Sequence, residues 1–138
     1  MDLRSNRKKQ IEKLAKRYNL TLLLLFGSQA TGHTHSESDV DVAYLSDRVL
    51  SFNEEIGLNT ELTQDFQNNQ ISLVNLKKAP PLLLKQIATR AVVLSESVPH
   101  AFEELYLRAL RSYEEARPIF DLREHYLKKK VAEYKHAG

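Results

Sequence analysis

The feature that most constrains the fold is a run of apolar residues at positions 22–26, four leucines and a phenylalanine, followed at once by Gly27 and Ser28. The run shows no alternation of apolar and polar side chains. Strands with this pattern are typical of sheets that are covered on both faces. The sequence therefore predicts a buried strand over about residues 20–26 that ends in a glycine turn.

Gly27 and Ser28 suit the binding of an anion. A glycine lets the backbone turn tightly and lets a ligand approach main-chain N–H groups without an intervening side chain. Ser28 is expected at the start of a short helical turn, where free N–H groups and a hydroxyl favour a phosphate. The turn is therefore a candidate phosphate-binding element.

Asp39 and Asp41 open the next apolar segment, two residues apart. On a strand, both carboxylates project from the same face. Two adjacent acids repel each other unless a cation lies between them, and oxygen ligands suit a divalent cation that carries a nucleotide. The pair therefore predicts a metal site beside the serine turn. The plainer alternative is an ordinary turn followed by two solvated charges.

The spacing of these residues resembles a known signature. Ten residues separate Ser28 from Asp39, which gives the pattern Gly-Ser-x10-Asp-x-Asp. The pattern is similar to that of the polymerase-β-type nucleotidyltransferase superfamily, and in a short chain it most resembles the minimal nucleotidyltransferases (the MNT or MntA-like group) that act as antitoxins to HEPN ribonucleases. The resemblance extends through residues 73–81. It implies an α/β nucleotidyltransferase fold, with a small mixed β-sheet flanked by helices and a long C-terminal helical region.

The resemblance also implies a function, that of an antitoxin of a toxin–antitoxin system. The chain would be a Mg-dependent protein adenylyltransferase that transfers AMP from ATP to a tyrosine hydroxyl of a cognate HEPN ribonuclease toxin and so neutralises it (AMPylation). Asp39 and Asp41 would be the catalytic residues and Mg²⁺ ligands, and Gly27 and Ser28 would bind the nucleotide. Toxin and antitoxin would form a hetero-oligomer. The acceptor residue, the number of AMP units, the stoichiometry and the nucleotide preference do not follow from the sequence.

Ser72 departs from the family pattern. The superfamily usually carries a third carboxylate on the following strand, at the position that aligns with Ser72. A serine can neither neutralise a metal nor take up a proton at neutral pH. Three interpretations stay open: an enzyme assisted by its partner, replacement of the acid by Glu37, Glu61 or Asp65, or an inactive nucleotide-binding antitoxin that neutralises the toxin by direct binding. The first is favoured because the rest of the pattern is complete.

Periodicity and turn residues predict the remaining elements. Helices are expected over residues 4–18, 51–66 and 100–136, and another that opens at residues 79–81 and includes residues 82–88. Further strands are expected over residues 39–45, 71–76 and 91–94. A capping-box pattern at Ser51 and Glu54 begins the second helix, and Pro118 predicts a bend in the last one. Ile56 and Leu82 are expected among the buried residues of their helices.

The length of 138 residues predicts one domain, with residues 1–98 as the minimal nucleotidyltransferase domain and residues 99–138 as its C-terminal helical extension. The extension either covers the sheet or docks a partner. A second domain of the kind that drug-modifying transferases use to hold an aminoglycoside does not fit into this length.

Composition excludes several other classes of protein. The chain has no cysteine, which excludes disulfides and thiolate metal sites and fits a cytoplasmic location. No apolar run is long enough to span a membrane. Residues 1–20 carry seven Lys/Arg against two acids, and residues 21–99 carry five against nine. No basic surface interleaved with aromatic residues is apparent, so direct binding of nucleic acid is not expected.

Overall fold

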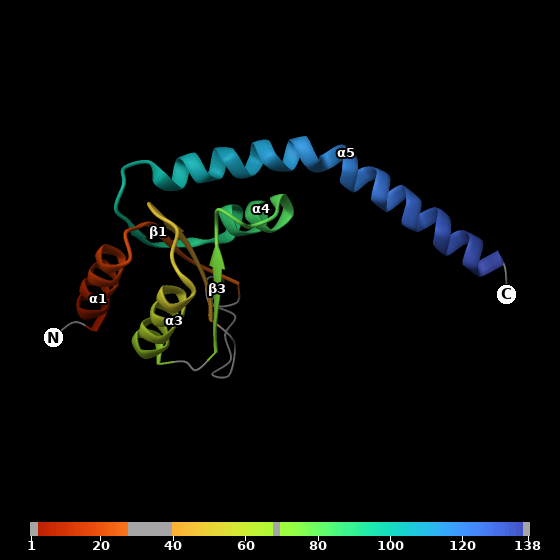
Figure 1. Ribbon diagram of the computed structural model, residues 1–138. Helices are drawn as coiled ribbons and strands as arrows, with labels where there is room; N and C mark the ends of the chain where they lie inside the picture. Colours follow the sequence, from red (N-terminus) through yellow and green to blue (C-terminus); the bar gives the residue numbers. More distant parts are fainter. Residues whose placement is uncertain (1–2, 28–39, 68–69, 137–138) are drawn as a thin grey trace.

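The computed structural model describes residues 3–27, 40–67 and 70–136 (Figure 1). The elements in chain order are α1 (Leu3–Arg17), β1 (Leu20–Phe26), β2 (Val40–Ser46), α3 (Phe52–Phe66), β3 (Ile71–Asn75), α4 (Pro81–Arg90), β4 (Val92–Glu96) and α5 (Ala101–His136). The predicted order of helices and strands is confirmed for these residues, with boundaries that move by one or two positions. No helix in the described part of the chain is long and apolar enough to cross a membrane.

The four strands form a mixed sheet with the order β3-β2-β1-β4. Strand β1 pairs antiparallel with both β2 and β4, and β2 pairs parallel with β3. The predicted α/β fold with a small mixed sheet is confirmed. Because β1 lies in the interior of the sheet, a neighbouring strand pairs with it along each of its edges.

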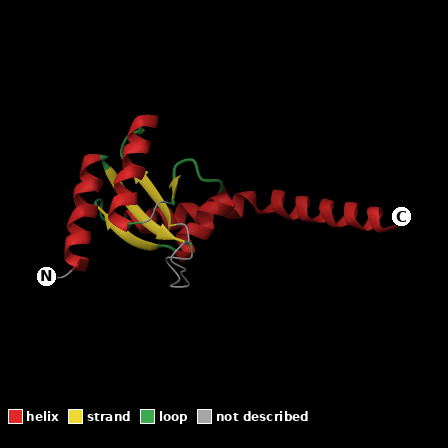
Figure 2. Ribbon diagram, turned by 90° about the horizontal axis from the view of Figure 1, so that it is seen from below, coloured by secondary structure: helices red, strands yellow, loops and turns green. Residues whose placement is uncertain are grey.

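The leucine run of β1 explains the packing on both faces of the sheet. Leu22, Leu23 and Leu24 are fully buried. Leu23 packs with the residues of α1 and α3, whereas Leu22 and Leu24 pack with those of α4 and α5. Each face is thus covered by two helices (Figure 2), which is why the strand lacks the alternation of a half-exposed strand.

Helix α3 begins with the predicted capping box. The Ser51 hydroxyl accepts a hydrogen bond from the backbone N–H of Glu54 at 3.1 Å, and the Glu54 carboxylate accepts one from the backbone N–H of Ser51 at 3.1 Å. Arg48 donates to the same carboxylate at 2.9 Å. The pKa of Glu54 is lowered to about 2, mainly by the hydrogen bond from Arg48 and secondly by the one from the Ser51 backbone.

Helix α5 is continuous through Pro118 and changes direction about half-way along its length, as predicted (Figure 1). Its first half packs on the sheet and on α4 through buried side chains that include Leu105 and Ala109. Arg108 donates a hydrogen bond to the carbonyl oxygen of Leu76 at 2.8 Å, which ties this half to the end of β3. The second half projects away from the sheet (Figure 2), and residues 121–135 are all exposed.

The predicted burial of Ile56 and Leu82 is wrong, because their side chains are 48% and 46% exposed. On α3 the buried residues are Leu58 and Leu62. Ile56 precedes Leu58 by two positions, which turns it about 200° around the helix axis to the opposite side. Leu82 similarly precedes the buried Leu84 by two positions.

Candidate functional site

Gly27 and Asp41 are in direct contact at one end of the sheet. Strand β1 ends at Phe26, which lies opposite Asp41 in the register of β1 and β2. Gly27 has φ +77°, in the left-handed region, and a Cβ built on it would overlap the Oδ2 atom of Asp41 and lie 3.1 Å from its Cγ. Only glycine allows the backbone of the turn to approach the carboxylate so closely.

Ser72 lies beside Asp41 on the edge of β2 that faces away from β1. In the parallel register of β2 and β3, Asp41 pairs with Ser72. Because β1 runs opposite to these two strands, its last residues meet the first residues of β2 and β3 at the same end of the sheet. The structure therefore brings Gly27, Asp41 and Ser72 together. Ser72, the position at which the resemblance predicts a third acid, is exposed.

Two predicted site residues, Ser28 and Asp39, lie outside the described residues, as does Glu37. Among the residues that the structure describes, no group of three or more His, Cys, Asp or Glu side chains gathers in one place. The described part of the site contributes one carboxylate, Asp41, and the sequence pattern adds Asp39 two positions earlier. An all-oxygen donor set of this kind fits Mg²⁺. The roles of these residues stay predictions.

Glu61 and Asp65 do not replace the missing acid. Both lie on α3, which covers the face of the sheet where Val40 and Val42 are buried. Glu61 forms an ion pair with Arg17 of α1. Because side chains alternate along β2, Asp41 projects from the other face. The interpretation that Glu61 or Asp65 supplies the third carboxylate is therefore wrong.

The carboxyl group of Asp65 is nevertheless perturbed. Burial raises its pKa, and the nearby positive charges of Arg7 and Arg17 partly oppose this effect. The environment of Asp65 thus belongs to the contact between α1 and α3, away from Gly27 and Asp41.

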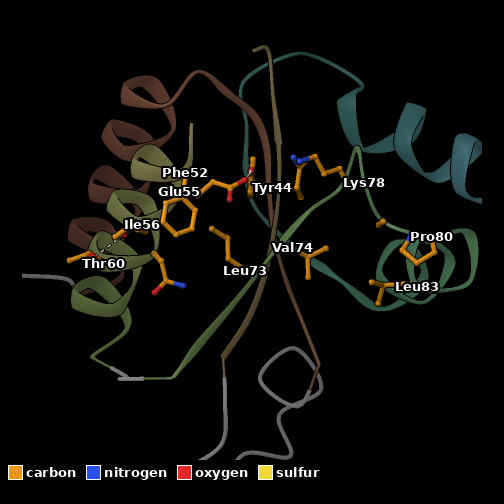
Figure 3. Close-up of a pocket in the computed structure, with 13 residues that line it drawn as sticks. Tyr44, Phe52, Glu55, Ile56, Thr60, Leu73, Val74, Lys78, Pro80 and Leu83 are labelled. Carbon is orange, nitrogen blue, oxygen red and sulfur yellow. Dashed lines mark hydrogen bonds between the residues drawn. The ribbon is translucent and has the colours of Figure 1, made fainter. Parts of the chain in front are cut away.

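A cavity of about 690 Å³ lies beside β3, between α3 and the start of α4 (Figure 3). Tyr44 and Glu55 both line this cavity. The hydroxyl of Tyr44 donates a hydrogen bond of 2.7 Å to the Glu55 carboxylate. Burial, together with the neighbouring Glu55, raises the pKa of the Tyr44 phenol. Tyr44 follows Asp41 by three positions on β2, so the two side chains project from opposite faces. Sequence reasoning missed this cavity, because it forms between elements that are distant in the chain.

The sheet topology and the contact between the glycine turn and the acidic strand define an α/β protein of the nucleotidyltransferase class. The family described as "Polymerase beta, Nucleotidyltransferase" matches residues 9–99, and the chain belongs to this family. No curated protein sequence matches the chain.

Solved structures with the same fold include toxin–antitoxin complexes. One, described as a toxin–antitoxin with AMP-PNP, is 27% identical with a TM-score of 0.69 over 83% of this chain and 95% of its own. Another, a tri-AMPylated Shewanella oneidensis HEPN toxin in complex with MNT antitoxin, is 23% identical with a TM-score of 0.64 over 86% of this chain and 96% of its own. A third, the toxin–antitoxin MntA-HepT, is 24% identical with a TM-score of 0.64 over 85% and 96%. The predicted resemblance to the MNT or MntA-like group is thus confirmed.

Proposed function

We propose that the chain is an antitoxin that transfers AMP from ATP to a tyrosine hydroxyl of a cognate HEPN ribonuclease toxin and thereby neutralises it. Membership of the nucleotidyltransferase family supports the class of reaction. The neighbour that is 27% identical is a toxin–antitoxin with AMP-PNP, in which the analogue stands in for ATP, and it supports both the nucleotide and the kind of partner.

The observation that carries the proposal is the close approach of the Gly27 backbone to the Asp41 carboxylate. It joins the phosphate-binding turn and the acidic strand of the sequence pattern in one place. In the proposal, Asp39 and Asp41 hold Mg²⁺, and Gly27 and Ser28 bind the phosphates of ATP. When bound there, Mg²⁺ would supply positive charge that offsets the negative charge of the triphosphate and of pyrophosphate. Residues 1–98 form the transferase unit, and residues 99–138 extend the same domain.

The transfer itself is an in-line displacement. The acceptor oxygen attacks the α-phosphorus of ATP, an O–P bond forms, the bond between the α- and β-phosphates breaks, and pyrophosphate leaves. Ser72 cannot take up the hydroxyl proton at neutral pH, so that proton passes to a base on the partner or to water. The attached AMP adds negative charge and bulk to the toxin beside its RNA-cleaving site, which inactivates it.

Ser72 also favours a second candidate function. With a hydroxyl in place of the third carboxylate, the chain would bind nucleotide without transferring AMP and would neutralise the toxin by direct binding. The same site residues would then serve to hold nucleotide within the complex.

Intact mass spectrometry separates these two functions. The chain is mixed with the protein that its neighbouring gene encodes, together with ATP and Mg²⁺, and the neighbour is weighed. We expect AMP-sized mass increments with the unmodified chain and none with Asp41→Asn. The matched control is Asp47→Asn, which makes the same change at an exposed acid just beyond the other end of β2. A stable complex without increments would contradict transfer and support direct binding.

A further inference from the structure

The second half of α5 carries an apolar face whose residues are exposed in the described part of the chain. We define the distal stripe by its exposed apolar residues, Ile119, Leu122, Tyr126, Leu127, Val131 and Tyr134, which are from 51% exposed at Leu127 to 86% exposed at Tyr134. This half of the helix projects beyond the sheet and its covering helices (Figures 1 and 2). An isolated helix of this length is only marginally stable in water, because most helices are stabilised by packing of an apolar face.

The stripe is continuous along the helix. Ile119, Leu122 and Tyr126 follow the spacing i, i+3, i+7, and a second row repeats at i, i+4, i+7 from Leu127 through Val131 to Tyr134. The second row is turned by about 100° around the helix axis relative to the first, because Tyr126 and Leu127 are consecutive residues. Together they form one broad face of the kind that packs against another helix.

Charge around the stripe indicates an acidic partner. Residues 117–136 carry six Lys/Arg against three Asp/Glu, a net charge of +3. Arg123 lies within the stripe, four positions from both Ile119 and Leu127, and it makes no ion pair among the described residues. Lys130, seven positions further along the same face, is 57% exposed. It forms a long ion pair of 3.7 Å with Glu133, and its Nζ atom lies 5.6 Å from the centre of the Tyr126 ring.

A second copy of the chain fits this face poorly. Two distal halves of α5 packed on each other would bring two segments of net charge +3 together. Like charges in close contact oppose association, whereas carboxylates placed opposite Arg123 and Lys130 favour it. The complementary occupant is therefore an amphipathic helix with acidic residues beside its apolar face.

We propose that the distal stripe is the surface by which the chain docks on its partner protein, and that the occupant is an acidic amphipathic helix of that partner. The inference rests on the proposed function for the identity of the partner. It adds that docking takes place on the second half of α5, which projects beyond the sheet that carries Asp41 (Figures 1 and 2). Binding and nucleotide transfer are then separable by substitution.

The test measures the affinity of the full-length chain for the protein encoded by its neighbouring gene, by titration calorimetry. The stripe variant is Leu122→Glu/Leu127→Glu. The matched control, His125→Glu/Ala132→Glu, adds the same two acids on the opposite side of the helix, and all four positions are exposed. We expect the stripe variant to bind about 100-fold more weakly or worse, and the control to stay within about threefold of the unmodified chain.

The outcomes distinguish the docking surface from the transfer reaction. If only the stripe variant loses binding and the unmodified chain adds no AMP, the docking surface stands and the proposed transfer fails. If the stripe variant still binds and modifies the neighbour, or if the unmodified chain does not bind the neighbour at all, the docking surface is overturned. Sedimentation velocity supplies the remaining outcome: a dimer of the unmodified chain that the stripe substitutions dissociate would make a second copy the occupant and overturn the acidic partner.

Discussion

At the scale of single residues, the backbone of Gly27 and the carboxylate of Asp41 act as one unit. A Cβ at position 27 meets the carboxylate, and the left-handed φ of +77° disfavours any L side chain there by about 1–2 kcal/mol. We therefore expect Gly27→Ala to lower the free energy of unfolding by about 1–3 kcal/mol and to weaken binding of Mg·ATP about tenfold or more. Urea unfolding and titration calorimetry measure the two effects.

A double variant isolates the steric part of this prediction. In an Asp41→Ala background the Oδ2 and Cγ atoms that the new Cβ would meet are absent, and only the φ penalty remains. Gly27→Ala should therefore cost less stability in that background than in the unmodified chain. If the stability losses of the two substitutions were strictly additive, the contact with Asp41 would not be the cause of the destabilisation by Gly27→Ala.

Ser72 stands where the resemblance predicts a third carboxylate, and its position permits a gain of function. It pairs with Asp41 in the sheet and is exposed. A carboxylate there would add a metal ligand and a base, so Ser72→Asp should raise the rate of AMP transfer about tenfold or more, whereas Ser72→Asn should not. Single-turnover assays followed by mass spectrometry compare the two. Equal rates would indicate that the step does not depend on a third acid.

The site could be predicted from sequence as far as it depends on local spacing. Gly27 and Asp41 were predicted to lie together because a strand, a turn and a second strand fix their positions, and the structure confirms the contact. The cavity beside β3 could not be predicted, because Tyr44 and Glu55 meet only after α3 packs on the sheet. For the same reason, the sequence alone could not show that Glu61 faces Arg17 of α1 instead of Asp41.

At the scale of secondary-structure elements, the cap of α3 links stability to pH. Hydrogen bonds from Arg48 and the Ser51 backbone hold the pKa of Glu54 at about 2, below its ordinary value of 4.5. A depressed carboxyl pKa contributes stability that is fully present above the unfolded pKa and is lost as the pH falls through the folded pKa. The stabilising effect of the cap should therefore disappear between about pH 4.5 and pH 2.

Urea unfolding over this pH range compares the unmodified chain with Glu54→Gln, which should lose that part of the pH dependence. Glu12→Gln serves as the control, because Glu12 is an exposed acid on α1 that forms no hydrogen bond or ion pair within the described residues. If Glu12→Gln flattened the profile as much as Glu54→Gln, the effect would come from net charge and not from the cap.

The elements themselves were largely predictable, and the failures have a common physical cause. The capping box at Ser51 and the strand at residues 22–26 are local patterns, and the structure confirms both. The burial of Ile56 and Leu82 was wrong because apolar character does not say which side of a helix meets the sheet. Ile56 instead lines the cavity beside β3. No local sequence pattern predicts this cavity.

At the scale of the whole molecule, the two halves of α5 lie in different environments, one packed on the sheet and one exposed. The apolar pattern of α5 continues on both sides of Pro118, so periodicity alone could not distinguish a core-forming half from a projecting one. In the structure Leu105 and Ala109 are buried against the sheet and α4, whereas Leu127 and Val131 are exposed. The first half belongs to the folded core, and the second half is available to a partner.

This division predicts that the second half of α5 is dispensable for folding. Removal of residues 121–138 should change the free energy of unfolding by no more than about 0.5 kcal/mol, because residues 121–135 are exposed. The shortened chain keeps the contact between the rings of Tyr113 and Phe120, whose centroids are 5.8 Å apart across Pro118. Leu105→Ala should cost about 2–5 kcal/mol, since it opens a cavity in the core. Urea unfolding compares the two, and a loss above about 2 kcal/mol on shortening would mean that the distal half stabilises the domain.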